Sequence, residues 1–161
     1  ILNKKSWTFE VHNQGWRYHM SNIMAAIGII QLKRFSKLAK KRQLLAKYYD
    51  KHLSHSKSIQ ILKQNYDEVV PHIYPIRIFN LTKRQKLQKS LNKIGIQTGI
   101  HYFPNHYLSF YNKHNKKKNL TITDKVFPEL LTLPLHPDLK REDIDYIVRS
   151  LFNIIPQCVK E

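Results

Sequence analysis

Cysteine and glycine are scarce in this chain of 161 residues, which contains one cysteine, Cys158, and four glycines. A single cysteine excludes an intrachain disulfide, as is common in proteins of a reducing cytoplasm. Four glycines are too few for a phosphate-binding Walker loop or a dinucleotide fingerprint, and neither pattern occurs. The longest apolar run, residues 23–30, is far shorter than the roughly 18–20 residues that cross a bilayer, so no membrane span is predicted.

Acidic residues are also few, because 11 Asp and Glu stand against 28 Lys and Arg, for a formal net charge of +17. No acid occurs between Glu10 and Asp50 or between Glu68 and Asp124. Such an excess favours nucleic acid or an anionic surface as a partner. The basic residues are mostly lysine, however, whereas specific nucleic-acid readers favour arginine. A solvated lysine surface is therefore the preferred explanation, and a free-standing basic binding module is the alternative.

Hydrophobic residues make up 42% of the chain, as in globular proteins. Alternation over residues 7–11 predicts a short strand or extended arm, and Ser21 is placed to cap a helix over 23–30. Gly28 inside that helix indicates close packing of another element, such as a second subunit. A second, longer amphipathic helix is expected over 33–52.

The rest of the chain alternates short strands with helices. Strands are predicted at 59–62, 73–79 (at an edge or a bulge, because of Pro71 and Pro75) and 96–102. Thr82 should cap a helix that ends at Gly95 in the left-handed conformation, and Pro128 should limit a helix that begins at Asp124. Residues 104–119 suggest a long loop with one helical turn, 130–135 a further extended segment, and 144–155 a final helix.

This order predicts an α/β chain of the α+β type, with helices and a small, mainly antiparallel sheet. We place a boundary after residue 54. Residues 1–54 would form the arm, the glycine-containing block and the linking helices on the side of a large domain or dimer partner. Residues 55–161 would form a small α+β subdomain.

Three clusters stand out, and the first two suggest chemistry. Residues 15–21 run into a helix N-terminus, where backbone N–H groups together with Arg17 and His19 suit a phosphate. Residues 99–107 follow a predicted strand and offer His101, Tyr102 and His106, which suit sugar hydroxyls. Residues 133–137 form a rigid link. An ordinary capped helix and a packed aromatic loop are the structural alternatives for the first two clusters.

A complete active site is not found. No metal-ligand cluster is predicted, because the histidine pair His52 and His55 has no nearby carboxylate or thiolate partner. Cys158 has no activating neighbour in the sequence, and no serine-centred nucleophile elbow occurs. We therefore assign no catalytic residue within this chain.

Taken in order, the motifs resemble the C-terminal part of the DegT/DnrJ/StrS family of pyridoxal-phosphate sugar aminotransferases. Residues 15–32, Gly-Trp-Arg-Tyr-His-Met-Ser-Asn-Ile-Met-Ala-Ala-Ile-Gly-Ile-Ile-Gln-Leu, are similar to the family block GxNYRMSxxxAAxGxxQL. His-Ile-Tyr-Pro-Ile-Arg at 72–77, Gly-Ile-Gln-Thr-Gly-Ile-His-Tyr at 95–102 and Leu-Pro-Leu-His-Pro at 133–137 follow in the family's order.

The resemblance implies the C-terminal subdomain of a fold-type-I aminotransferase, an enzyme that is usually a homodimer and uses pyridoxal 5'-phosphate. Such enzymes move an amino group, typically from glutamate, to a keto-sugar nucleotide for lipopolysaccharide, O-antigen, capsule or antibiotic sugars. They are expected in the cytoplasm. The resemblance also implies that Arg17 and His19 reach the partner's cofactor phosphate across the dimer, and that His101, Tyr102 and His106 line the sugar-nucleotide pocket. Arg17 and His19 replace the family's usual Asn and Arg.

The family's Schiff-base lysine lies in a Ser-x-His-x-x-Lys motif upstream of the glycine block, and this chain has no such motif. Because the first residue is Ile1 rather than Met, we expect the natural protein to start upstream. Transamination by this chain alone is not expected. A separately encoded N-terminal fragment is a candidate partner, and a dehydratase-like relative or a non-functional remnant are alternatives.

Overall fold

The computed structural model describes residues 12–16, 18–114 and 120–160. The chain divides into two compact units, residues 1–34 and 35–161. The predicted arm at 7–11 lies outside the described residues. The boundary predicted after residue 54 stays a prediction.

The first helix, α1, spans Asn22–Leu53 without interruption, so the prediction of two successive helices over 23–30 and 33–52 is wrong. The reason is that residues 31–34, Gln-Leu-Lys-Arg, are good helix formers and no proline separates the two predicted segments. The predicted cap is confirmed, because the backbone N–H of Met24 donates to Ser21 Oγ at 3.3 Å. Among the residues that the structure describes, no atom outside the neighbouring turns of α1 lies within 4 Å of a Cβ built on Gly28.

A three-stranded antiparallel sheet with strand order β1-β2-β3 forms the centre of residues 35–161. The strands are β1 (Ile59–Ile61), β2 (Tyr74–Ile78) and β3 (Leu130–Leu133). The mainly antiparallel sheet is thereby confirmed, but β2 is the central strand and the predicted edge position is wrong. Pro75 is tolerated there because β1 pairs only with residues 76–78 of β2, so the β1 ladder ends before the proline.

Helix α2 (Arg84–Lys93) begins one residue later than Thr82 predicts, with Lys83 at its N-cap. The Thr82 hydroxyl instead donates to the backbone carbonyl of Cys158 at 3.4 Å, so the predicted capping role is wrong. After α2, Gly95 adopts a φ of 82°, which confirms the predicted left-handed termination.

Residues 104–114 contain more helix than the single predicted turn. A 3₁₀ turn, η1 (Asn105–Tyr107), is followed by α3 (Ser109–His114). Further along, α4 (Thr121–Val126) gives way to the 3₁₀ turn η2 (Phe127–Glu129), and the limit that Pro128 sets is confirmed. The last helices are α5 (Arg141–Ile154) and η3 (Ile155–Gln157).

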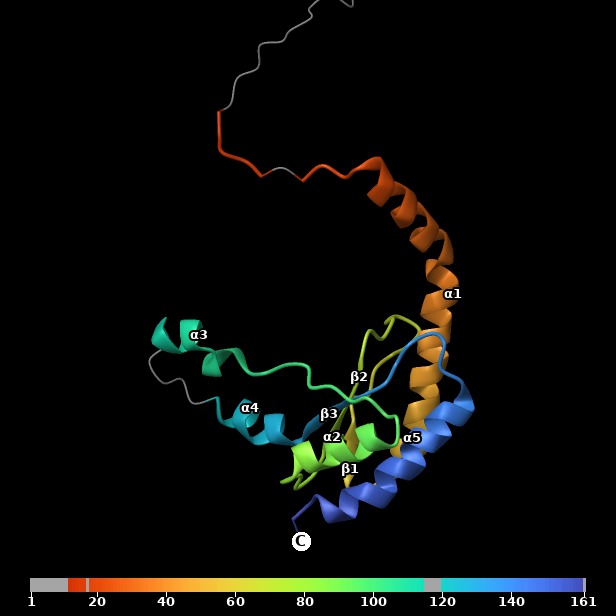
Figure 1. The fold of residues 1–161 in the computed structure, drawn as a ribbon, viewed down its shortest axis with the longest axis vertical. Helices are drawn as coiled ribbons and strands as arrows, with labels where there is room; N and C mark the ends of the chain where they lie inside the picture. Colours follow the sequence, from red (N-terminus) through yellow and green to blue (C-terminus); the bar gives the residue numbers. More distant parts are fainter. Residues whose placement is uncertain (1–11, 17, 115–119, 161) are drawn as a thin grey trace, which may run out of the picture. The chain divides into compact units, whose positions relative to one another are not determined.

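The second half of α1, together with α2 and α5, packs against one face of the sheet (Figure 1). Strand β2 directs Tyr74, Ile76 and Ile78 into this core, where all three are buried. Their partners on β3, Leu131 and Leu133, are buried in the same cluster. The helices contribute buried side chains from the second half of α1, from α2 and from α5: Leu45, Tyr49, Leu53, Leu87, Leu91, Ile144, Ile147 and Leu151.

Candidate functional site

The segment that carries the predicted substrate residues runs alongside β3. Gly99 and Thr132 exchange both backbone hydrogen bonds, at 2.9 and 2.8 Å. Gly99 is the only residue of the predicted strand 96–102 that pairs in this way among those described, so a full strand there is a wrong prediction. A glycine without a side chain and the nearby Pro104 both weaken strand pairing, which leaves one bridge.

Thr132 lies on the face of the sheet opposite the helical core. Its neighbours Leu131 and Leu133 point into the core, and successive side chains of a strand alternate between faces. The ring of His101 lies at this face, where its Nδ1 is 3.0 Å from the Thr132 hydroxyl oxygen. Thr132 is buried, with 6% of its surface exposed. The close approach requires glycine at 99, because an added Cβ would lie 2.8 Å from the His101 ring carbon Cε1.

The same segment is held at a second point, by a hydrogen bond of His106 on η1. The Nε2 of His106 lies 2.7 Å from Oδ1 of Asp124 on α4, and the hydroxyl of Tyr107 donates to the same oxygen at 2.5 Å. The bonds from Tyr107 and His106 lower the pKa of Asp124. The bond to the carboxylate raises the pKa of Tyr107. Because an ionised carboxylate only accepts hydrogen bonds, Nε2 of His106 must carry the hydrogen of this bond.

Aromatic rings of the same segment contact one another and Phe127 of η2. The rings of Phe103 and Phe127 meet edge to face at a centroid distance of 5.5 Å, and Phe103 also contacts Tyr107 at 5.7 Å. The guanidinium of Arg84 on α2 lies 4.5 Å from the ring centre of Phe127, whose backbone carbonyl accepts a hydrogen bond from it. Tyr102 is 71% exposed, so its ring is open to a ligand.

The predicted phosphate residues belong to the other unit of the chain. His19 is exposed and lies just before α1, whose first turn contains no acid. Arg17 lies outside the described residues, so its role stays a prediction.

Two residues that support the loop escaped the sequence analysis, Thr132 and Asp124, whereas Tyr107 ends the predicted cluster 99–107. Each acquires its role through a partner 17 to 31 residues away in the chain. A weak signal existed for Asp124, which is the first acid after a long stretch without any and stands at the start of a predicted helix. For Thr132 the sequence offers only its place in an apolar run.

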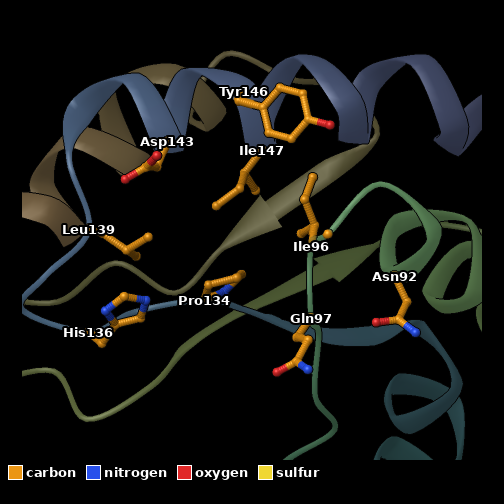
Figure 2. A pocket seen from close by; sticks show the side chains of 10 residues that line it. Asn92, Ile96, Gln97, Pro134, His136, Leu139, Asp143, Tyr146 and Ile147 are labelled. Atoms are coloured by element: carbon orange, nitrogen blue, oxygen red, sulfur yellow. The ribbon is translucent and has the colours of Figure 1, made fainter.

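A cavity of about 660 Å³ lies elsewhere, between the end of α2, α5 and residues 134–139 (Figure 2). Asp143, Tyr146 and Ile147 reach it from α5, and Gln97 and Pro134 lie across from them. None of the described residues that line it is a lysine or arginine, and none is a predicted substrate residue. The cavity is therefore separate from the predicted substrate residues.

The part of the chain that the structure describes contains neither a cluster of metal-ligating side chains nor a helix that could span a membrane. Within it, no three histidine, cysteine, aspartate or glutamate side chains gather as a metal site would require. Likewise, no described helix combines the length and the apolar character needed to span a membrane.

Comparison with known proteins agrees with this architecture. A curated relative from Campylobacter jejuni subsp. jejuni serotype O:2, UDP-4-amino-4,6-dideoxy-N-acetyl-beta-L-altrosamine transaminase, is 29% identical over 163 aligned residues. The alignment includes 99% of this chain and 43% of the relative, so the chain spans less than half of the relative's length.

Solved structures of related enzymes match nearly the whole of this chain and also less than half of their own length. A protein of Streptococcus pneumoniae described as a sugar aminotransferase, in its PLP form, has a TM-score of 0.87 and 26% identity over 98% of this chain and 41% of its own. PseC of Helicobacter pylori, an aminotransferase involved in the biosynthesis of pseudoaminic acid, has a TM-score of 0.83 and 25% identity over 97% and 43%. The fold is that of a C-terminal subdomain of these enzymes. The profile of the DegT/DnrJ/EryC1/StrS aminotransferase family matches residues 2–152, and the chain belongs to this family.

Proposed function

We propose that this chain is the C-terminal part of an aminotransferase that transfers an amino group, with glutamate as donor, to a keto-sugar nucleotide. The products would serve surface polysaccharides such as lipopolysaccharide, or related sugars. The observation that carries the proposal is the match of nearly the whole chain to a transaminase of a UDP-linked amino sugar. The complete enzyme would be a cytoplasmic homodimer.

His101, Tyr102 and His106 would bind the sugar nucleotide. Thr132 and Asp124 hold the imidazoles of His101 and His106 in place, and Tyr102 offers an exposed ring whose centre lies 4.9 Å from that of His101. Histidine and tyrosine side chains donate to and accept from sugar hydroxyls, and an exposed ring can cover the apolar face of a sugar. This arrangement supports a role in substrate binding and orientation.

The start of α1 would hold the phosphate of pyridoxal 5'-phosphate. A helix leaves its first backbone N–H groups without acceptors inside the helix, and this first turn contains no acid that would repel an anion. Ser21, which caps the helix, and His19 beside it fit a phosphate, and Arg17 would add a permanent positive charge. Pyridoxal phosphate, when bound, supplies the electron sink for moving an amino group.

The family's Schiff-base lysine, which binds the cofactor covalently, lies in a motif that this chain does not contain. We therefore propose that the 161 residues do not transaminate alone and need the lysine-bearing part, either in the same polypeptide or as a separate fragment. A histidine at the position of that lysine would instead make the complete protein a dehydratase-like relative.

A direct test compares the chain alone with the protein translated from any coding sequence that lies in frame before Ile1. Each is incubated with pyridoxal phosphate, glutamate and a UDP-4-keto sugar, then desalted; bound cofactor is measured by absorbance and amino sugar by mass spectrometry. We expect cofactor and product with the longer protein and neither with the chain alone. Amino sugar made by the chain alone would contradict the proposal that it needs the lysine-bearing part. The absence of product with both proteins would contradict the proposed aminotransferase activity.

The phosphate role is tested separately in the longer protein. Arg17→Ala should weaken cofactor retention about tenfold or more, since charge-assisted hydrogen bonds to phosphate are strong. Arg34→Ala, which removes an exposed arginine further along α1, is the matched control and should leave retention unchanged. Equal retention by Arg17→Ala and the wild type would contradict the phosphate role.

The alternative, a free-standing basic module for nucleic acid or anionic surfaces, is supported by the net charge of +17. This alternative predicts that the logarithm of the binding constant for nucleic acid falls steeply and linearly as the logarithm of the salt concentration rises. Weak binding of equal strength to every polyanion would instead indicate the lysine-rich surface.

A further inference from the structure

Asp124 holds the candidate substrate loop from outside the loop. It lies on α4, whereas its two partners, His106 and Tyr107, belong to η1, 18 and 17 residues earlier in the chain. Both bonds converge on one carboxylate oxygen, at 2.7 and 2.5 Å. Short bonds to an ionised acceptor are the strong class of hydrogen bond.

The loop is anchored at both ends by side chains of α4 and β3, which come later in the chain. Near its start, His101 contacts the hydroxyl of Thr132 on β3 at 3.0 Å, and near its end Asp124 holds η1. Within η1 the backbone bonds are local, from Tyr107 N–H to the Pro104 carbonyl. These local bonds form a turn but do not attach it to the rest of the fold.

Burial and charge agree with an anchoring role for Asp124. The His106 side chain is 16% exposed and the Asp124 side chain 35%, so water competes only in part for their bond. The lowered pKa of Asp124 keeps the carboxylate ionised at neutral pH, as an acceptor for both partners.

We propose that Asp124 is a positioning residue for the substrate: by holding His106 and Tyr107 it fixes the loop that presents Tyr102 and His101. This inference rests on the proposed function, because it takes the loop to be the sugar-nucleotide surface. Helix α4 thereby sets the shape of a binding surface to which it contributes no predicted contact.

The test measures loop order and ligand binding separately in the complete protein. Amide hydrogen exchange of the peptide that covers 103–108 is followed by mass spectrometry without ligand, and the affinity for UDP-N-acetylglucosamine, a stable nucleotide-sugar probe, by calorimetry. Asp124→Ala should speed exchange by about two- to fivefold and weaken binding by a similar factor, the size expected for partly exposed charged bonds. Asp124→Glu, which keeps the carboxylate, should restore part of both.

Asp67→Ala is the matched control, since Asp67 is an exposed acid that pairs with Lys47 at 2.9 Å and, among the residues that the structure describes, forms no bond to the loop. It should leave both measurements unchanged. Unchanged exchange in Asp124→Ala would overturn the anchoring role. Faster exchange with unchanged affinity would overturn the positioning role. If the wild type binds no nucleotide sugar, the proposed function fails and the positioning role with it, whereas the exchange result still decides the anchoring.

Discussion

Gly99→Ala should displace the His101 ring while leaving the fold intact. The new Cβ would lie 2.8 Å from Cε1 and 3.3 Å from Nδ1 of His101, whereas carbon atoms in contact stay roughly 3.5–4.0 Å apart. The backbone at residue 99 does not lie in the left-handed region, so alanine adds no backbone strain. The ring must therefore move, and its 3.0 Å contact with the Thr132 hydroxyl is lost.

The size of the effect follows from the burial of Thr132, of which 6% is exposed. A buried hydroxyl without a partner costs about 1–3 kcal/mol, so the free energy of unfolding should fall by about that amount. Thr132→Val removes the hydroxyl itself and should cost about 1 kcal/mol. In the Thr132→Val background Gly99→Ala leaves no hydroxyl unpaired, so its cost should drop by about 1 kcal/mol.

Urea unfolding followed by circular dichroism measures all four proteins of this double-mutant cycle. A coupling of about 1 kcal/mol between the two sites is the expected outcome. Effects that add within about 0.3 kcal/mol would refute the reasoning, because they would show that the two substitutions do not act on one shared contact. The affinity of Gly99→Ala for UDP-N-acetylglucosamine should also fall, which a purely structural role for His101 does not require.

Three further outcomes are expected. Burial raises the pKa of Glu129, but hydrogen bonds from Arg77 and from the Asn80 N–H lower it by more, to below its ordinary value. This stabilisation is present above about pH 4.5 and is lost as the pH falls through the folded-state pKa, so Arg77→Gln should flatten the acid limb of a stability-against-pH curve. Leu91→Ala, at a side chain with no exposed surface, should lower the unfolding free energy by about 2–5 kcal/mol in urea titrations. Gly28→Ala should raise the helix content of α1 but weaken the proposed homodimer in analytical ultracentrifugation, since no described atom of this chain would meet the added Cβ; an unchanged dimer would contradict packing of a second subunit there.

Local signals explain why much of the fold was predictable. Ser21 caps α1, Gly95 ends α2 and Pro128 limits α4, and in each case the preference belongs to that residue and its immediate neighbours. The alternation of apolar residues in β2 was equally visible, because one face of the strand contacts the core.

The errors arose where tertiary contacts decide the outcome. Pro75 lies in the central strand because β1 is too short to pair with it, and the length of β1 is not encoded near the proline. Thr82 bonds to the carbonyl of Cys158, 76 residues away, and this bond replaces the capping that its sequence position favours. Residues 96–102 have a strand-like pattern, but β3 offers them one pairing position, at Thr132.

The candidate site divides in the same way. The imidazoles and the phenol of the loop were predictable by residue type and by motif, since they are contiguous in the sequence. The orientation of these side chains was not predictable, because the residues that hold them, Thr132 and Asp124, come from β3 and α4. The side of the sheet on which Thr132 lies depends in turn on how β3 pairs with β2. If the loop binds a sugar nucleotide, its specificity is therefore set as much by these two supporting residues as by the histidines, and substitutions at either should change affinity without removing a single predicted ligand contact.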